Sequence, residues 1–137
     1  MERFAFTLVS VTSAEGVSDT LRFTGSGRMK KTPDGWLLRY TGSDGAGNGV
    51  TSSLKLWDDG RRAVIINDAY HLTLDAEAEV DLVLPAPGGA LTLTAVARRL
   101  FWRLGEDDGE ITLDYTLCQA GSPAGDMHLT MDLKEER

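Results

Sequence analysis

Apolar and polar residues alternate along most of this chain, in short runs separated by turn residues. Successive side chains of a β-strand point to opposite faces, so a period of two predicts strands with one buried and one solvated face. The run 20–30 is the clearest example. Its inward face carries Leu21, Phe23, Gly25, Gly27 and Met29. Glycine inside a strand indicates a bend, a bulge or a close approach of other atoms, so Gly25 and Gly27 predict a corner of the sheet.

Similar runs continue as far as Leu133 and predict an all-β protein. They cover residues 36–41, 53–57, 63–66, 72–74, 80–84, 91–98, 100–104, 111–118 and 127–134. Segments 73–80 and 95–104 contain helix formers but no apolar stripe at helical spacing, so we expect strand or strand plus loop there. Short connections favour an antiparallel meander, and closure of the sheet removes its exposed edges. We therefore predict one domain over residues 1–137, a closed or nearly closed calycin-type barrel of about eight to ten strands.

Glycine, proline and aspartate mark predicted turns at 32–35, 58–60, 85–89 and 105–109. Turn chemistry also accounts for the neighbouring carboxylates in two of these segments, so we do not assign them to acid–base catalysis. The Gly-rich segment 42–49 is predicted to be the longest flexible loop and to overhang one end of the barrel. It lacks the Lys-Ser/Thr ending and the following helix of a phosphate-binding loop.

The chain carries 21 acidic and 14 basic side chains, for a formal net charge of −7. This balance argues against nucleic acid and anionic membranes as partners, because both are bound through lysine and arginine. Three short basic groups, 28–31, 61–62 and 98–99, are predicted to be solvated strand ends; the alternative is that they meet in a phosphate-binding mouth. No segment approaches the roughly 20 apolar residues of a membrane helix, and the N-terminal residues show no targeting signal. With one cysteine, Cys118, and no internal disulfide possible, we expect a cytoplasmic protein.

Residues that could bind a metal or act as nucleophiles are isolated in the sequence. His71, Cys118 and His128 belong to no recognisable ligand pair, so we predict neither a metal site nor a cofactor. A Cys118–His128 pair across neighbouring strands is conceivable, but both residues share the outward parity of threonines and aspartates, and nucleophilic catalysis needs a third, orienting group. We therefore expect no catalytic residue and no enzymatic activity.

Aromatic residues at inward parity are the remaining candidates for a binding site. A barrel interior either packs solidly or leaves a cavity lined by such side chains. If a ligand enters, we expect the lining or the mouth to include Trp36, Arg39, Tyr40, Trp102 and Tyr115. Trp57, Val83, Val96 and Phe101 have outward parity, and a contiguous patch of them would indicate self-association.

Several stretches carry a resemblance to a known family. They are Gly-Trp-Leu-Leu-Arg-Tyr at 35–40, Gly-Val-Thr-Ser-Ser-Leu-Lys-Leu at 49–56, Pro-Gly-Gly-Ala-Leu at 87–91 and Gly-Glu-Ile-Thr-Leu-Asp-Tyr-Thr-Leu at 109–117. On these residues the chain resembles the bacterial YwiB-like family, the domain of unknown function 1934, from Leu21 to Leu133. The resemblance implies a calycin-like β-barrel, similar in shape to lipocalins and fatty-acid-binding proteins, and it implies no activity.

Two segments depart from the pattern of that family. Asn67-Asp68-Ala69 stands where members commonly carry Arg-x-Gly, which puts a shared polar site there in doubt. Leu84-Pro85-Ala86-Pro87 replaces the usual Tyr-x-Thr-Pro before the Pro-x-Gly turn.

Three functions follow from this sequence, in decreasing order of support. The first is a non-enzymatic binding module that takes a small, partly apolar ligand inside the barrel. The second is a solid-core structural or interaction protein that works through an outer sheet face or a homodimer contact. The third is an enzyme, such as a hydrolase using polar residues at the barrel mouth, which would need perturbed carboxylates converging in a cleft.

Overall fold

A computed structural model describes residues 1–136 of the chain, and all its regular secondary structure is β-strand. The strands are β1 (Arg3–Ala14), β2 (Val17–Thr32), β3 (Gly35–Ser43), β4 (Gly49–Trp57), β5 (Arg62–Ile66), β6 (His71–Asp75), β7 (Val80–Ala86), β8 (Gly89–Leu104), β9 (Asp108–Gln119) and β10 (Ser122–Glu135). Residues 1–136 contain no helix with the length and apolar character needed to cross a membrane.

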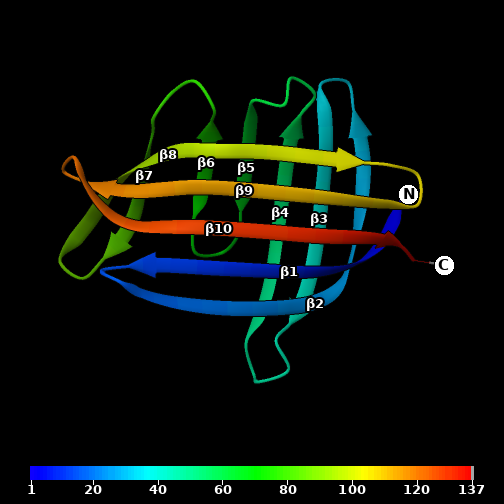
Figure 1. Ribbon diagram of the computed structural model, residues 1–137, viewed down its shortest axis with the longest axis horizontal. Coiled ribbons are helices and arrows are strands. Elements are labelled where there is room, and N and C mark those ends of the chain that lie inside the picture. The colour runs from blue at the N-terminus through cyan, green and yellow to red at the C-terminus, as the bar shows by residue number, and fades with distance from the viewer. Residues whose placement is uncertain (137) are drawn as a thin grey trace.

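The ten strands form one antiparallel sheet that nearly closes into a barrel. Its order is β6-β5-β4-β3-β2-β1-β10-β9-β8-β7, so consecutive strands pair except for β6 and β7, which form the two edges, and β1 joins β10. The edge strands β6 and β7 lie close together, and β6 also contacts β8. Figure 1 shows two crossed layers, with β3–β6 running behind and across β8, β9, β10 and β1. The predicted all-β meander barrel is confirmed.

Strand β2 passes from one layer to the other, and two glycines allow it to do so. Figure 1 shows the strand curving at the right-hand side of the view. A β-carbon at Gly25 would lie 2.1 Å from the carbonyl oxygen of Thr41, and one at Gly27 would lie 2.6 Å from Cζ of Phe4. Neither position has room for a side chain. The corner predicted from the two inward glycines is therefore present, and it also makes space for an aromatic ring.

The predicted turns are present, but the strands reach further into them than the sequence indicated. Pro85 and Ala86 belong to β7, which leaves Pro87 and Gly88 as the turn, with Gly88 at φ 82°. The predicted 42–49 loop is shorter, because Gly42 and Ser43 extend β3 and Gly49 begins β4. Asp44 orders what remains, since its Oδ1 accepts hydrogen bonds from the amides of Ala46 (2.7 Å) and Asn48 (3.1 Å).

Segment 95–104 is strand, as predicted, and it explains a change of parity along β8. The sequence places apolar residues at odd positions up to Ala97 and at even positions from Leu100. The pairing of β8 with β9 shifts between Ala97 and Arg99, so Arg98 is the extra residue of a β-bulge. The bulge returns Leu100 to the inner face. Segment 73–80 is likewise strand plus turn, since β6 ends at Asp75 and β7 starts at Val80.

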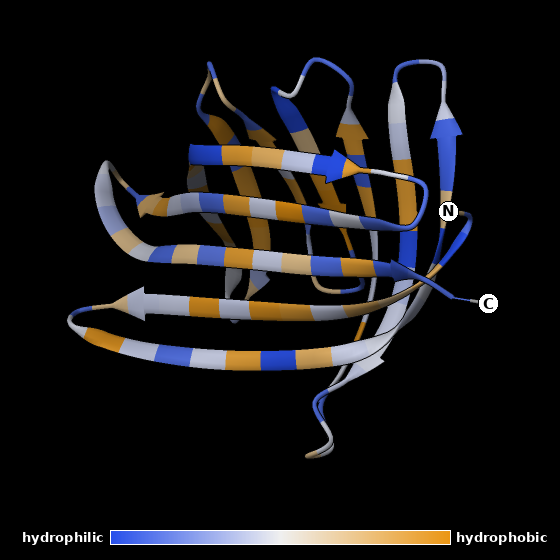
Figure 2. Cartoon of the chain, turned by 45° about the vertical axis from the view of Figure 1, so that its right-hand side comes forward, coloured by the Kyte–Doolittle hydropathy of each residue, from blue (hydrophilic) through white to orange (hydrophobic). Residues whose placement is uncertain are grey.

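The space between the two layers is filled by apolar side chains. Figure 2 shows the alternation of apolar and polar residues along each strand. The largest fully buried residues are Phe4, Leu38, Leu54, Leu56, Leu74, Ile111, Leu113, Met131 and Leu133. Leu21 has the inward parity of this set but is 41% exposed. Leu21 pairs with Ser10 on β1 but lies outside the β2–β3 pairing, which begins at Thr24.

Candidate functional site

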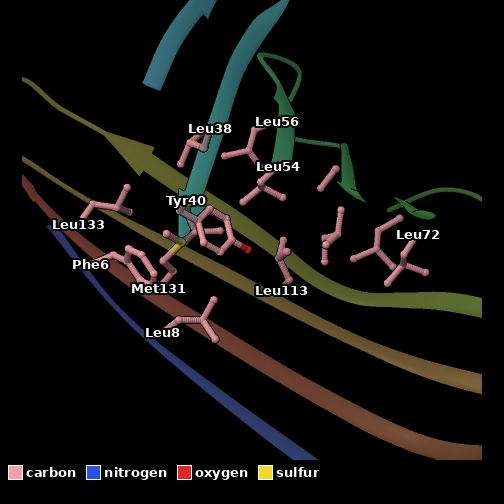
Figure 3. Packing of buried hydrophobic residues seen from close by; sticks show 14 of the residues in the cluster. Phe6, Leu8, Leu38, Tyr40, Leu54, Leu56, Leu72, Leu113, Met131 and Leu133 are labelled. Carbon is pink, nitrogen blue, oxygen red and sulfur yellow. The ribbon is translucent and has the colours of Figure 1, made fainter. Parts of the chain in front are cut away.

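Buried tyrosines place polar hydroxyl groups in the barrel interior, near one end. Tyr40 on β3 is 5% exposed and packs edge-to-face on Phe6, with ring centroids 5.1 Å apart. Figure 3 shows its hydroxyl directed toward Leu113. Burial raises the pKa of Tyr40 to about 12, because the phenolate would lose its hydration, and a hydrogen bond with Ser52 opposes this in part.

Tyr115 on β9 is the second buried phenol, and its pKa is raised for the same reason. Tyr70, in the loop between β5 and β6, adds to the rise in the pKa of both Tyr40 and Tyr115 through electrostatic repulsion. Tyr70 is half-buried and packs against the core from the barrel end. Of the predicted residues, Tyr40 and Tyr115 belong to the buried core, and Tyr70 packs against that core.

The other predicted binding residues lie elsewhere. Trp36 is four residues from Tyr40 on β3, about 13 Å along the strand, and the Nζ of Lys31 lies 5.2 Å from its ring. Trp102 is half-buried near the far end of β8, opposite Ile111. Arg39 is exposed and points to the outer face, away from Tyr40. The five predicted residues thus do not form one site.

An apolar cleft opens beside Tyr70. It has a volume of about 420 Å³ and lies between the β3–β4 hairpin and the β5–β6 loop. Val50, Ala69 and Tyr70 supply its apolar wall. Figure 1 shows both loops at the lower end of the β3–β6 layer. We call this space the end cleft.

The β5–β6 loop holds its shape through Asn67. Its Oδ1 accepts hydrogen bonds from the amides of Ala69 (2.9 Å) and Tyr70 (3.0 Å), and its own amide donates to the carbonyl of Tyr70 (3.0 Å). This is the Asn67-Asp68-Ala69 segment that departs from the family pattern. Asn67 and Asp68 line the end cleft and a neighbouring one. That departure was the one sequence signal pointing to this loop, while nothing in the two-residue pattern singled out Tyr70.

The neighbouring cleft is larger and polar. It has a volume of about 750 Å³ and lies on the outer face of β2, β3 and β4. Its outward side chains are those of Arg28, Arg39, Ser26, Thr41, Thr51 and Ser53, with Arg3 and Glu136 at one end. We call it the outer cleft. Arg39, predicted as a mouth residue, belongs to this surface and not to the barrel interior.

The residues considered for metal binding or nucleophilic catalysis stay apart. Residues 1–136 hold no group of three or more histidine, cysteine or acidic side chains arranged for a metal. His128 is exposed and hydrogen-bonds the carboxylate of Asp114, whereas Cys118 lies opposite Pro123. The pairing places His128 opposite Asp114, four residues from Cys118, so the conceivable Cys118–His128 pair does not form.

Comparison with known proteins agrees with the fold. The model of a family described as a domain of unknown function (DUF1934) matches residues 7–131. The crystal structure of the ywiB protein from Bacillus subtilis has a TM-score of 0.78 and 16% identity, covering 99% of this chain and 93% of that one. The S-type phycobiliprotein lyase CPES from Guillardia theta has a TM-score of 0.44 and 8% identity, covering 97% and 88%. No curated protein matches the sequence.

Proposed function

The chain belongs to the family of the domain of unknown function DUF1934, and from its geometry we propose that it is a non-enzymatic cytoplasmic module that binds a small, partly apolar ligand. The ligand enters at the end cleft rather than in the centre of the barrel. This refines the expectation of a fully internal site, because large side chains less than 2% exposed fill the centre.

One observation carries the proposal: Tyr70 belongs both to the wall of the end cleft and to the packing of the core. A ligand in the cleft would contact the Tyr70 ring and Val50 through apolar surface. Thr41, Thr51 and Asn67, which also line the cleft, offer polar groups for hydrogen bonds. A few polar groups in an apolar concavity are typical of small-molecule sites.

The three carboxylates with a shifted pKa are not suited to act as general acids. The pKa is lowered for Asp34 chiefly by a hydrogen bond from Lys55, for Asp44 by Asn48, and for Asp75 by the Glu77 amide. These three residues belong to three separate turns or strand ends. A general acid requires a raised pKa, and none of the three shifts goes in that direction.

Binding of a neutral fluorescent probe, N-phenyl-1-naphthylamine, tests the proposal. We expect saturable binding of one equivalent, loss of binding in Val50→Asp, which puts a carboxylate into the cleft, and retained binding in Tyr70→Phe. Val83→Asp is the matched control, because Val83 is 60% exposed on β7 and outside the cleft. Absence of saturable binding, or equal loss in both aspartate variants, would overturn the proposal.

A solid-core interaction protein is the second candidate, and the dense core favours it. The outward apolar residues give it little support. Val83 lies opposite Thr92, nine residues from Phe101 on β8 and so about 30 Å away. Trp57 is half-buried, with Lys55 and Arg62 over its ring. Sedimentation at micromolar concentration discriminates, since a homodimer would favour this candidate and a monomer that binds the probe would favour the first.

A further inference from the structure

Three arginines lie side by side in one row across the outer face. Arg28 on β2 is directly opposite Arg3 on β1 and directly opposite Arg39 on β3. Residues opposite each other on neighbouring antiparallel strands have β-carbons about 5 Å apart, and like charges in such positions destabilise a sheet. We call these residues the arginine row. Repulsion between these three positive charges destabilises the folded protein.

No carboxylate of the described chain neutralises the row. Within residues 1–136, the guanidinium groups of Arg3, Arg28 and Arg39 form no ion pair. Other cations do have acidic partners, namely Lys31, Lys55, Arg61, Arg62 and Arg103. Some cations outside the row also form no ion pair within residues 1–136, namely Arg22, Lys30, Arg98, Arg99 and Lys134. The row differs from them because the pairing aligns three arginines on adjacent strands.

The basic groups that the sequence suggested for a phosphate-binding mouth do not meet. Arg61 pairs with Asp75 and Glu77, and Arg62 pairs with Asp59. Arg98 and Arg99 lie on β8, where Arg98 donates to the hydroxyl of Thr116 at 3.1 Å. Of those groups, only Arg28 joins the row.

Hydroxyl groups surround the row in the outer cleft. Ser53 lies opposite Arg39 on β4, while Ser26, Thr41 and Thr51 form the adjacent row across β2, β3 and β4. The hydroxyls of Thr41 and Thr51 are 3.3 Å apart. Guanidinium groups donate paired hydrogen bonds that match phosphate oxygens, and hydroxyls donate further ones. Glu136 and Asp68 also border the cleft, and they limit how far an anion can extend.

We propose that the arginine row is a binding site for a small phosphorylated anion. Arg28 and Arg39 hold the phosphate oxygens, Arg3 adds charge from β1, and the hydroxyls of Ser26, Thr41 and Ser53 complete the site. A nucleic acid fits less well, because the row is short and the net charge of −7 repels a long polyanion. The site adjoins the end cleft but does not require a ligand there.

Calorimetric titration with inorganic phosphate, pyrophosphate and phenyl phosphate, at low and physiological salt, tests the proposal. We expect one saturable site for at least one of these anions. Arg28→Gln and Arg39→Gln should each weaken binding roughly tenfold or more. The matched control is Arg22→Gln, because Arg22 is exposed on the same strand and lies opposite Val9, outside the row. The affinity of the Arg22→Gln variant for these anions should stay within about twofold of that of the unsubstituted protein.

The outcomes separate this site from the proposed apolar one. Tighter binding of phenyl phosphate than of inorganic phosphate would identify an organic phosphate as the occupant, and equal binding would identify the free ion. Failure of all three anions to saturate, or equal weakening by Arg22→Gln, would overturn the arginine site while leaving binding of the neutral probe unaffected. Circular dichroism melts verify that each variant is folded.

Discussion

Replacing Leu113 by alanine measures how tightly the barrel interior is packed. Leu113 on β9 is 0% exposed and lies between Leu100 and Leu129 in the sheet. Figure 3 shows it facing Tyr40 and Leu54 of the other layer. Loss of the buried carbons costs roughly 2 kcal/mol in transfer free energy. A cavity that cannot collapse adds to this, for a total of about 3–5 kcal/mol.

Leu21→Ala is the matched control, because the sequence pattern gives both leucines the same inward parity. Leu21 is 41% exposed, so its truncation should cost less than about 1 kcal/mol. For a domain of 137 residues, Leu113→Ala should lower Tm by roughly 10–15 °C and Leu21→Ala by less than about 4 °C. Urea unfolding followed by tryptophan fluorescence gives both free energies of unfolding.

A small effect at Leu113 would refute the packed interior. If Leu113→Ala cost less than about 1.5 kcal/mol, the space beside it would already be solvated or empty, because only part of the transfer term would be lost. The binding site would then be a hollow barrel interior, as predicted from the sequence, in place of the end cleft. A loss in the predicted range confines any ligand to the barrel ends.

Three other substitutions test particular features. Gly27→Ala should lower Tm in a thermal melt, because its β-carbon would lie 2.6 Å from Cζ of Phe4, whereas Gly49→Ala, whose nearest contact would be 3.5 Å, should not. Tyr40 has a pKa of about 12 in the folded state and an ordinary pKa of 10.0, so its contribution to the free energy of unfolding should be complete below pH 10 and fall as the pH rises toward 12. Tyr40→Phe should reduce this fall. An unchanged dependence of the free energy of unfolding on pH would contradict the assigned burial. Arg28→Gln should raise Tm by about 1–3 °C through relief of repulsion in the arginine row, and a lower Tm would show that the guanidinium has a stabilising partner.

The strands and the inner face followed from the sequence because they depend on local alternation. The β-bulge at Arg98 was also visible in the sequence, because the apolar residues of segment 91–104 change there from odd to even positions. Leu21 shows where this reasoning stops. It is exposed in a part of β2 that β3 does not pair with, and the length of that pairing is not recorded in the local pattern.

The candidate sites were less accessible from sequence, because they depend on register between distant segments. Arg3, Arg28 and Arg39 are separated along the chain, and only the pairing of β1, β2 and β3 aligns them. Tyr70 lies in a loop, where no periodicity applies. Buried Tyr40 and Tyr115 were identified because they sit at inward positions of regular strands.

The pairing of β1 with β10 bears on the order of assembly. Phe4 lies opposite Glu135, and the amide of Glu136 donates to the carbonyl of Arg3 at 3.0 Å. During synthesis, β1 has β2 on one side but an unmatched edge on the other until β10 leaves the ribosome, an interval in which it is open to wrong partners. A circularly permuted chain that begins at β7 and ends at β6 would make every neighbour in the sheet a sequential hairpin, and its lower contact order should speed folding.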